Sequence, residues 1–390
     1  MEFSFTALEM VFLCGNWHLS RARRMSFNSL PIIDLKQAFD PETKSLFLSD
    51  LRHALVEVGF FVLINFEEYG PSRQDLVDIE KQAVEFFALP KELKQEVAMV
   101  NSPHFLGYTD VGQEITSGRV DLREQIDLAT ELAAPSKDLP LYHQVEGPNL
   151  WPDEKTLPYF RPVITRYIER MTALSKVTRG LVAEAIGLPK DGLDFVFREN
   201  QQYKMKLVSY PDNHTDVDDK ADTDFKQGVG AHRDNTFMTF IYQAIEIEGS
   251  LQVENFEGKW IPVGKKPNSL VVNVGQLLEN ITDGICKATI HRVVSPKKGS
   301  GGRLSVPFFQ TVDTEAYQEK LANFPPEVLR LRDNRDQQLT TWGTDIGFQF
   351  TPDLTKSPAG YSVFKNRIKS HQDVAERWYP EVLKEVLAEF

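Results

Sequence analysis

The sequence predicts an α+β protein with a mainly β core, an antiparallel sandwich or barrel flanked by helices on its N-terminal and C-terminal sides. Apolar residues recur at helical spacing before residue 200 and again after residue 312. Between these parts, short runs rich in β-branched and aromatic residues follow one another, separated by turn residues. No internal repeat is visible, and we expect one interlocked domain overall.

The composition is that of an ordinary globular protein. The chain has 390 residues, of which 41% are hydrophobic and 26% charged. Its net charge of -12 leaves no basic footprint for nucleic acid. The two cysteines, Cys14 and Cys286, allow neither a disulfide framework nor a cysteine-based zinc site. No run approaches the roughly 20 apolar residues of a membrane-spanning helix. We therefore expect a cytoplasmic protein with no nucleic-acid or membrane partner and an undetermined oligomeric state.

Residues 1–24 differ in character from the rest of the chain. A short apolar stretch is interrupted by Glu9, and arginines follow it at positions 21, 23 and 24. This order is wrong for a secretory signal. We expect a disordered leader, or an upstream start to a protein whose working start is Met25. A mitochondrial presequence is the alternative.

Residues 25–200 form the predicted N-terminal region, which mixes helices and strands. Gly59 and Gly187 end two of its helices. The predicted elements are strands at Leu30–Leu35 and Phe60–Phe66, helices at Leu46–Val58, Pro71–Leu89 and Pro158–Ile186, and a loop-rich region at Pro103–Trp151.

Residues 201–312 form the predicted β core, and residues 313–390 a helical region, notably at Tyr361–Phe390. This tail could pack on its own core or on a second subunit. The acidic segment Asp212–Lys226 is expected to be a solvated loop, with a lid over the site as the alternative. The predicted strands are Lys204–Tyr210, Phe237–Tyr242, Ser250–Glu254, Ser269–Val274, Thr289–Val294 and Arg303–Thr311.

Two histidines of the β half lie in informative positions. In a strand, His232 and Asp234 project from the same face because they are two residues apart. His291 follows 59 residues after His232, and several intervening strands could return it to the same point. Two imidazoles and one carboxylate on one face form the facial triad of non-haem Fe(II) oxygenases. The His-x-Asp triplet is weak evidence alone, since a strand histidine is more often simply packed.

A second pair of side chains strengthens the metal-site hypothesis. Arg303 and Ser305 follow His291 by 12 and 14 residues, and they share a strand face. A buried arginine with an adjacent hydroxyl suits a carboxylate. Taken alone, such a pair is usually a solvated strand edge. Its order and spacing after the three candidate ligands favour the functional interpretation.

Together these motifs make the chain resemble the Fe(II)/2-oxoglutarate-dependent dioxygenases of the isopenicillin N synthase-like family. The resemblance runs from Leu30 to about Gln310 and implies a double-stranded β-helix, or jelly roll. The matching segments are Leu30–Leu35, Gly59–Val62, Phe86–Pro90, Leu207–Pro211, Gly230–Asp234, Leu251–Val253, Val271–Gly275, His291–Val294 and Arg303–Ser305.

The resemblance also assigns roles to individual residues. It implies that His232, Asp234 and His291 hold Fe(II), with O2 and 2-oxoglutarate as co-substrates. It further implies that Arg303, Ser305 and Tyr210 bind the distal carboxylate of 2-oxoglutarate. An acidic ligand at position 234 leaves no halide position, so halogenation is not expected.

Two positions depart from the family pattern. Val208 stands where plant members of the family often have Asn, which removes a polar contact to the co-substrate. Gln276 replaces an acid that often follows the Val-Gly pair, which affects local hydrogen bonding more than chemistry.

The expected reaction is hydroxylation, desaturation or oxidative cyclisation of a small organic metabolite, in secondary metabolism by analogy. Candidate pocket residues, each equally compatible with ordinary core packing, are Phe105, Phe240, Leu251 and Phe308. Three alternatives stay open: an Fe(II) oxidase without 2-oxoglutarate, whose Arg303 would hold the substrate carboxylate; a non-catalytic jelly-roll binding protein; and a zinc hydrolase on the same ligands.

Overall fold

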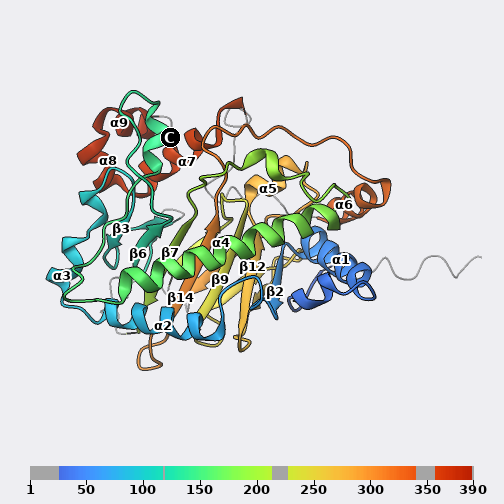
Figure 1. Ribbon diagram of the computed structural model, residues 1–390, viewed down its shortest axis with the longest axis horizontal. Helices are drawn as coiled ribbons and strands as arrows, with labels where there is room; N and C mark the ends of the chain where they lie inside the picture. The colour runs from blue at the N-terminus through green and yellow to red at the C-terminus, as the bar shows by residue number, and fades with distance from the viewer. Residues whose placement is uncertain (1–25, 117–118, 213–226, 340–355, 389–390) are drawn as a thin grey trace, which may run out of the picture.

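The protein is built around two β-sheets, as a computed structural model shows for residues 26–116, 119–212, 227–339 and 356–388 (Figure 1). The predicted leader at residues 1–24 and nearly all of the acidic segment Asp212–Lys226 lie outside these described residues. The predicted α+β architecture, a mainly β core flanked by helices, is confirmed.

The larger sheet has eight strands in the order β1-β2-β12-β9-β14-β7-β6-β3. β1 and β2 are parallel, and the other neighbouring strands are antiparallel. The strands are β1 (Ile32–Asp34), β2 (Phe60–Ile64), β3 (Gly107–Thr109), β6 (Glu124–Ala129), β7 (Lys204–Tyr210), β9 (Met238–Ile245), β12 (Ser269–Val274) and β14 (Arg303–Gln310).

The smaller sheet has four strands in the order β11-β10-β13-β8. It carries both candidate histidine ligands on adjacent antiparallel strands. Its strands are β8 (Gln227–His232), β10 (Leu251–Glu254), β11 (Trp260–Pro262) and β13 (His291–Val294), and a separate hairpin joins β4 (Ile115–Thr116) to β5 (Arg119–Val120).

Long helices cover one face of the larger sheet, with α4 (Phe160–Ala185) lying across its strands and α2 (Arg73–Phe87) beside it (Figure 1). The apolar side chains of α4 recur at spacings of three and four residues, so they form one stripe that the sheet buries. Ser72 and Asp75 form a reciprocal capping box that begins α2. Packing of the α2 and α4 stripes fixes the sheet behind the cavity described below.

The C-terminal end of the first long helix contacts the segment that precedes His291. The remaining helices before the β core are α1 (Lys44–His53), which continues as a π-helical turn over Ala54–Val58, and α3 (Lys91–Glu96). Gly59 ends the turn with φ of 77°. The backbone N–H of Lys287 donates to the Leu55 carbonyl and the Thr289 hydroxyl to the Val58 carbonyl. These bonds hold the N-terminal helix against the chain that precedes a candidate ligand.

The helical tail packs on its own chain. The later helices are α5 (Gln276–Ile281), α6 (Pro326–Gln338), α7 (Ala359–Ser370), α8 (Gln372–Trp378) and α9 (Pro380–Ala388). Phe364 and Tyr379 pack with Phe105 in a cluster distinct from the main core. The tail is three short helices rather than one long helix, because the backbone leaves the helical conformation at His371 and again at Tyr379, where the following Pro380 disfavours it.

Six strands, β3, β4, β5, β6, β8 and β11, were not recognised in the sequence. β6 lies within the predicted loop-rich region, and β8 begins where the acidic segment ends. β6 reads Glu-Gln-Ile-Asp-Leu-Ala, yet Gln125 and Asp127 are both buried. Gln125 and Asp127 alternate with Ile126 and Leu128, so the period-two pattern of a strand is present, but it does not show that both faces of this strand are buried.

Replacing Gly59 by alanine should lower the free energy of unfolding by at least about 2 kcal/mol. An added Cβ would lie 2.1 Å from the Lys287 carbonyl oxygen, in addition to the cost of a left-handed backbone. Gly284→Ala is the matched control, because Gly284 has φ of 75° and an added Cβ there meets nothing within 4 Å. Urea unfolding of both variants measures the difference. Equal losses would show that the close approach carries no cost.

The free energy of unfolding should decrease as the pH falls, because of the titration of His371. Burial lowers the pKa of His371 from 6.5 to about 4, and the nearby Arg367 charge acts in the same direction. Because its folded pKa is lowered, the folded state binds fewer protons, so this contribution is complete above pH 6.5 and is lost as the pH falls towards 4. Relative to His371→Phe, the wild type should lose up to about 3 kcal/mol over that window, as measured by urea unfolding. Parallel pH profiles of the two proteins would contradict the assignment.

Candidate active site

A cavity of about 260 Å³ lies between the two sheets. Strands β7, β9 and β14 of the larger sheet and β8, β10 and β13 of the smaller sheet contribute its walls, and α7 contributes residues from the C-terminal region. All six residues predicted for the iron and 2-oxoglutarate sites line it: His232, Asp234, His291, Arg303, Ser305 and Tyr210.

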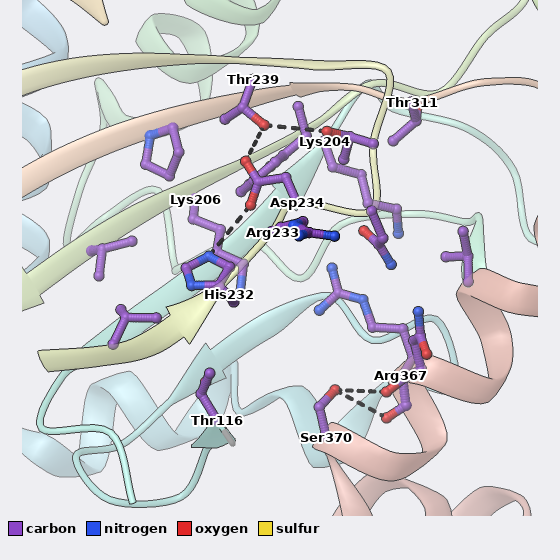
Figure 2. Close-up of a pocket in the computed structure, with 18 of the residues that line it drawn as sticks. Thr116, Lys204, Lys206, His232, Arg233, Asp234, Thr239, Thr311, Arg367 and Ser370 are labelled. Atoms are coloured by element: carbon purple, nitrogen blue, oxygen red, sulfur yellow. Dashed lines mark hydrogen bonds and ion pairs between the residues drawn. The ribbon is translucent and has the colours of Figure 1, made fainter. Parts of the chain in front are cut away.

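Strand pairing brings the two histidines together. His232 ends β8 and is the register partner of His291, which begins β13. Their ring centroids are 4.2 Å apart. Asp234 lies in the loop after β8 rather than within the strand, whereas the sequence predicts His232 and Asp234 on the same face of one strand. Its Oδ1 is 3.4 Å from His232 Nε2, as Figure 2 shows, and 3.8 Å from His291 Nε2, so one donor atom of each residue faces the same point.

The Asp234 carboxylate is held by two residues of the larger sheet. The Thr239 hydroxyl of β9 and the Asn273 amide of β12 both donate to its Oδ2, at 2.5 and 2.9 Å. Burial alone would raise the pKa of Asp234, but His232, His291 and Thr239 hold it well below its usual range. The carboxylate is therefore ionised, with Oδ1 directed at the histidines.

Backbone carbonyls orient both imidazoles. Nδ1 of His232 lies 2.8 Å from the Gly230 carbonyl, and Nδ1 of His291 lies 3.3 Å from the Thr289 carbonyl. Each contact favours the tautomer with a proton on Nδ1, which leaves the Nε2 lone pair free. Burial, followed by the neighbouring His232, lowers the pKa of His291 to about 4. Neutral imidazole is the form that binds a metal ion.

The donor set fits ferrous iron. One donor atom from each of His232, Asp234 and His291 lies within 4.8 Å of the others, the one such group of His, Cys, Asp or Glu among the described residues. Two imidazole nitrogens and a carboxylate oxygen on one side of an ion, with a cavity on the other, match the facial arrangement of non-haem iron sites. Cys286 is buried in the main core, so no thiolate among the described residues biases the site towards zinc.

The residues predicted to bind the 2-oxoglutarate carboxylate lie on two adjacent strands of the larger sheet. Arg303 and Ser305 of β14 pair with Tyr210 and Val208 of β7. The guanidinium of Arg303 lies 5.1 Å from the Tyr210 ring centroid, and its Nε donates to Glu246 Oε2 at 2.9 Å. Because Glu246 engages Nε, it fixes the plane of the guanidinium.

Leu251 lines the cavity, but Phe240 and Phe308 do not. Both belong to the main core, where their ring centroids are 6.4 Å apart. The physical reason is strand alternation: if Arg303 and Ser305 face the cavity, then Phe309 also does and Phe308 points to the opposite face. The prediction that Phe240 and Phe308 line the cavity is therefore wrong, and their immediate neighbours on each strand line it instead.

Phe105 also lies away from the cavity. It is fully buried in the C-terminal cluster, where its ring stacks on Tyr379 at 5.8 Å between centroids and meets Phe364 edge-on. The sequence contains no signal for this position, because the partners of Phe105 lie more than 250 residues later in the chain.

Comparison with known proteins agrees with this geometry. Residues 30–154 match the N-terminal model described as "non-haem dioxygenase in morphine synthesis", and residues 200–312 match the 2OG-Fe(II) oxygenase superfamily. The chain is 43% identical over 362 residues to the 2-oxoglutarate-dependent dioxygenase frbJ of a Dothideomycetidae species, covering 92% of this chain and 95% of that protein. This chain belongs to the 2OG-Fe(II) oxygenase superfamily.

Two further relatives extend the comparison of this dioxygenase. Homoarginine-6-hydroxylase 2-ODD-C23.1 of Arabidopsis thaliana is 30% identical over 307 residues, covering 76% of this chain and 88% of that protein. A full-length Neurospora crassa protein solved with alpha-KG superposes with a TM-score of 0.64 at 23% identity, over 86% of this chain and 95% of that one. A second structure of the Neurospora protein also contains thymine, with a TM-score of 0.61, 23% identity and coverage of 79% and 96%. At this identity the two structures establish the shared fold.

These findings confirm the predicted class. The protein is a 2-oxoglutarate-dependent dioxygenase that uses Fe(II), and the alternatives of a 2-oxoglutarate-independent oxidase, a non-catalytic binding protein and a zinc hydrolase lose their support. No helix in the described ranges is long and apolar enough to cross a membrane.

The dioxygenase cavity also contains charged residues that sequence reasoning missed. Lys204, Lys206, Val208 and Tyr210 follow one another at intervals of two residues on the cavity face of β7. Extending this spacing backwards from Tyr210 would therefore have found the two lysines. Arg367 of α7 reaches the same cavity from far along the chain, and no local pattern indicates it.

Replacing Thr239 by valine should weaken Fe(II) binding by about 10- to 100-fold, because the isosteric side chain no longer holds Asp234 Oδ2. Anaerobic Fe(II) titration of the apoprotein measures the affinity. Thr178→Val serves as the control, since that hydroxyl bonds only to the Leu174 carbonyl within α4. Unchanged Fe(II) affinity in Thr239→Val would show that the hydroxyl does not support the ligand.

Proposed function

We propose that this dioxygenase oxidises a C–H bond of a small organic metabolite, in secondary metabolism, with hydroxylation as the favoured outcome over desaturation and oxidative cyclisation. The observation that carries the proposal is that the three-residue donor set and the Arg303–Ser305 pair line one cavity. The relative named as a homoarginine hydroxylase favours hydroxylation.

In this proposal His232, Asp234 and His291 hold Fe(II). The bound iron supplies the chemistry that couples decarboxylation of 2-oxoglutarate by O2 to removal of a substrate hydrogen. The contribution of the chain is positional, because Thr239 and Asn273 fix the carboxylate before any ligand arrives.

Arg303, Ser305 and Tyr210 would hold the distal carboxylate of 2-oxoglutarate. The guanidinium is only 2% exposed, and its Nη2 lies 3.5 Å from Gln243 Oε1. A guanidinium already oriented by Glu246 binds a carboxylate with little loss of conformational freedom. Val208 lies opposite Ser305, so the contact often made by Asn in plant members is replaced by an apolar surface.

The substrate must be small. Ligand cavities are typically about 300–1,000 Å³, and 2-oxoglutarate would take part of the 260 Å³ available here. Apolar side chains line the region near the metal ligands and would exclude water from the reacting carbon; they include Val208, Ile241, Leu251 and Val293. Cytoplasmic location remains part of the proposal, supported by the scarcity of cysteine.

Anaerobic titration of the Fe(II)-loaded protein with 2-oxoglutarate tests these assignments. A visible metal-to-ligand charge-transfer band should appear and saturate for the wild type. Arg303→Met should raise the Kd for 2-oxoglutarate by about 10- to 100-fold, because a charge-assisted contact is lost.

The matched control is Arg292→Lys. Arg292 lies on β13, its guanidinium stacks on Trp260 at 3.9 Å, and it does not line the cavity. Its Kd for 2-oxoglutarate should equal that of the wild type. Absence of the band in the Fe(II)-loaded wild type, or an unchanged Kd in Arg303→Met, would reject the assigned 2-oxoglutarate site.

A further inference from the structure

The cavity has a second cationic region, at the opposite end of β7 from the proposed 2-oxoglutarate site. Tyr210 pairs with Arg303, whereas Lys204 pairs with Phe309. Six residues of extended strand separate Tyr210 from Lys204, which corresponds to about 20 Å. A short diacid held by Arg303 and the metal ligands cannot also reach Lys204, so the second region is available to another molecule.

Helix α7 completes this region from the other side. Arg367 extends from α7 into the cavity (Figure 2), and its Nη1 donates to Asp127 Oδ1 at 3.2 Å. The same carboxylate oxygen lies 3.4 Å from Lys206 Nζ. Both cations therefore converge on one buried aspartate of β6. α7 lies outside the two segments that match family models, so Arg367 is not part of the shared catalytic core.

The carboxylates at this end of β7 are already engaged by cations. Asp127 pairs with Lys206 and Arg367, and Glu146, which also lines the cavity, pairs with Arg198 at 2.5 Å. Glu114 and Asp121 pair with Arg123, which lies towards the Tyr210 end because Glu124 of β6 pairs with Ser209 of β7.

Lys204 is the cation of this region with no carboxylate within 4 Å among the described residues, although Asp127 and Glu146 act on it from farther away. It is 8% exposed, and its Nζ donates to the backbone carbonyl of Val145 at 2.5 Å. Burial, followed by the charge of Arg367, lowers the pKa of Lys204 to about 7. A buried ammonium group without a counter-ion is costly. A ligand carboxylate beside it would remove that cost.

We propose that Lys204, Lys206 and Arg367 form a subsite for a carboxylate of the substrate. The substrate is then a small organic acid, amino acids included, oxidised at a carbon remote from that carboxylate. This inference rests on the proposed function, because the remaining part of the same substrate must lie at the metal ligands.

The test uses the full-length Fe(II)-loaded chain with 2-oxoglutarate. The probes are the standard amino acids, L-homoarginine and a set of aryl and cyclic monocarboxylic acids, each beside its carboxamide. Succinate formation measures turnover, and the charge-transfer band measures 2-oxoglutarate binding. Free acids should stimulate succinate formation, and their carboxamides should not.

Two variants address the subsite directly. Arg367→Met and Lys204→Met should each raise the KM of the responding acid by about 10- to 100-fold, with the Kd for 2-oxoglutarate unchanged. Lys365→Met is the matched control, because Lys365 is on α7 but does not line the cavity. Lys204→Met also covers the case in which Arg367→Met fails to fold, since methionine suits a buried position.

Four results would overturn the subsite: carboxamides as effective as acids, no response to any acid while the band forms, a response confined to phosphate monoesters, or an unchanged KM in both variants. Failure of the band in the wild type would instead reject the proposed function, so the two failures are distinguishable. Stimulation by acids alone, together with the raised KM values, supports the carboxylate subsite.

Discussion

The position of the Asp234 carboxylate depends on both sheets, and the geometry of the candidate active site follows from it. Asp234 sits in the loop after β8 of the smaller sheet, yet its Oδ2 accepts hydrogen bonds from β9 and β12 of the larger sheet. The two histidines come from the smaller sheet alone. The separation of the sheets therefore sets where the carboxylate lies relative to the imidazoles. Gly275, which follows β12, permits the close approach of the segment between β8 and β9 that carries Asp234. An added Cβ at Gly275 would lie 1.9 Å from the Thr236 carbonyl oxygen.

The cavity concentrates charge in a protein interior that normally avoids it. Removing an ion pair from water costs more than the pair regains unless its geometry is excellent. Arg303 with Glu246, and Lys206 with Asp127 and Arg367, meet this requirement by sharing carboxylates within a wall of strands. Such groups are poor sources of stability, so ligand binding explains their presence better than folding does. The apolar stripe of α4 against the larger sheet supplies the stabilising burial instead.

The C-terminal helices pack in an apolar cluster and also contribute side chains to the cavity. Phe105, Phe364 and Tyr379 anchor α7–α9 against the N-terminal part of the chain. That anchoring places one face of α7 at the cavity, with Arg367 and Ser370 on it. His371 follows directly and is buried beside Phe105. The packing of this helical cluster thus determines which charges reach the bound molecules.

The sequence by itself predicted the fold class, the three candidate iron ligands and the candidate carboxylate-binding pair, because each rests on short motifs at recognisable spacing. The boundaries of β7 and β12 agree with the predicted strands, since their runs of branched residues end at clear turn residues. The same alternation, applied consistently, would have excluded Phe240 and Phe308 and found Lys204 and Lys206. Only the tertiary structure decided the rest. Glu246 and Asp127 come to bond to the cavity-lining Arg303 and Arg367 because non-consecutive strands and a distant helix meet around the cavity. Local spacing carries no information about such contacts, since long-range packing creates them.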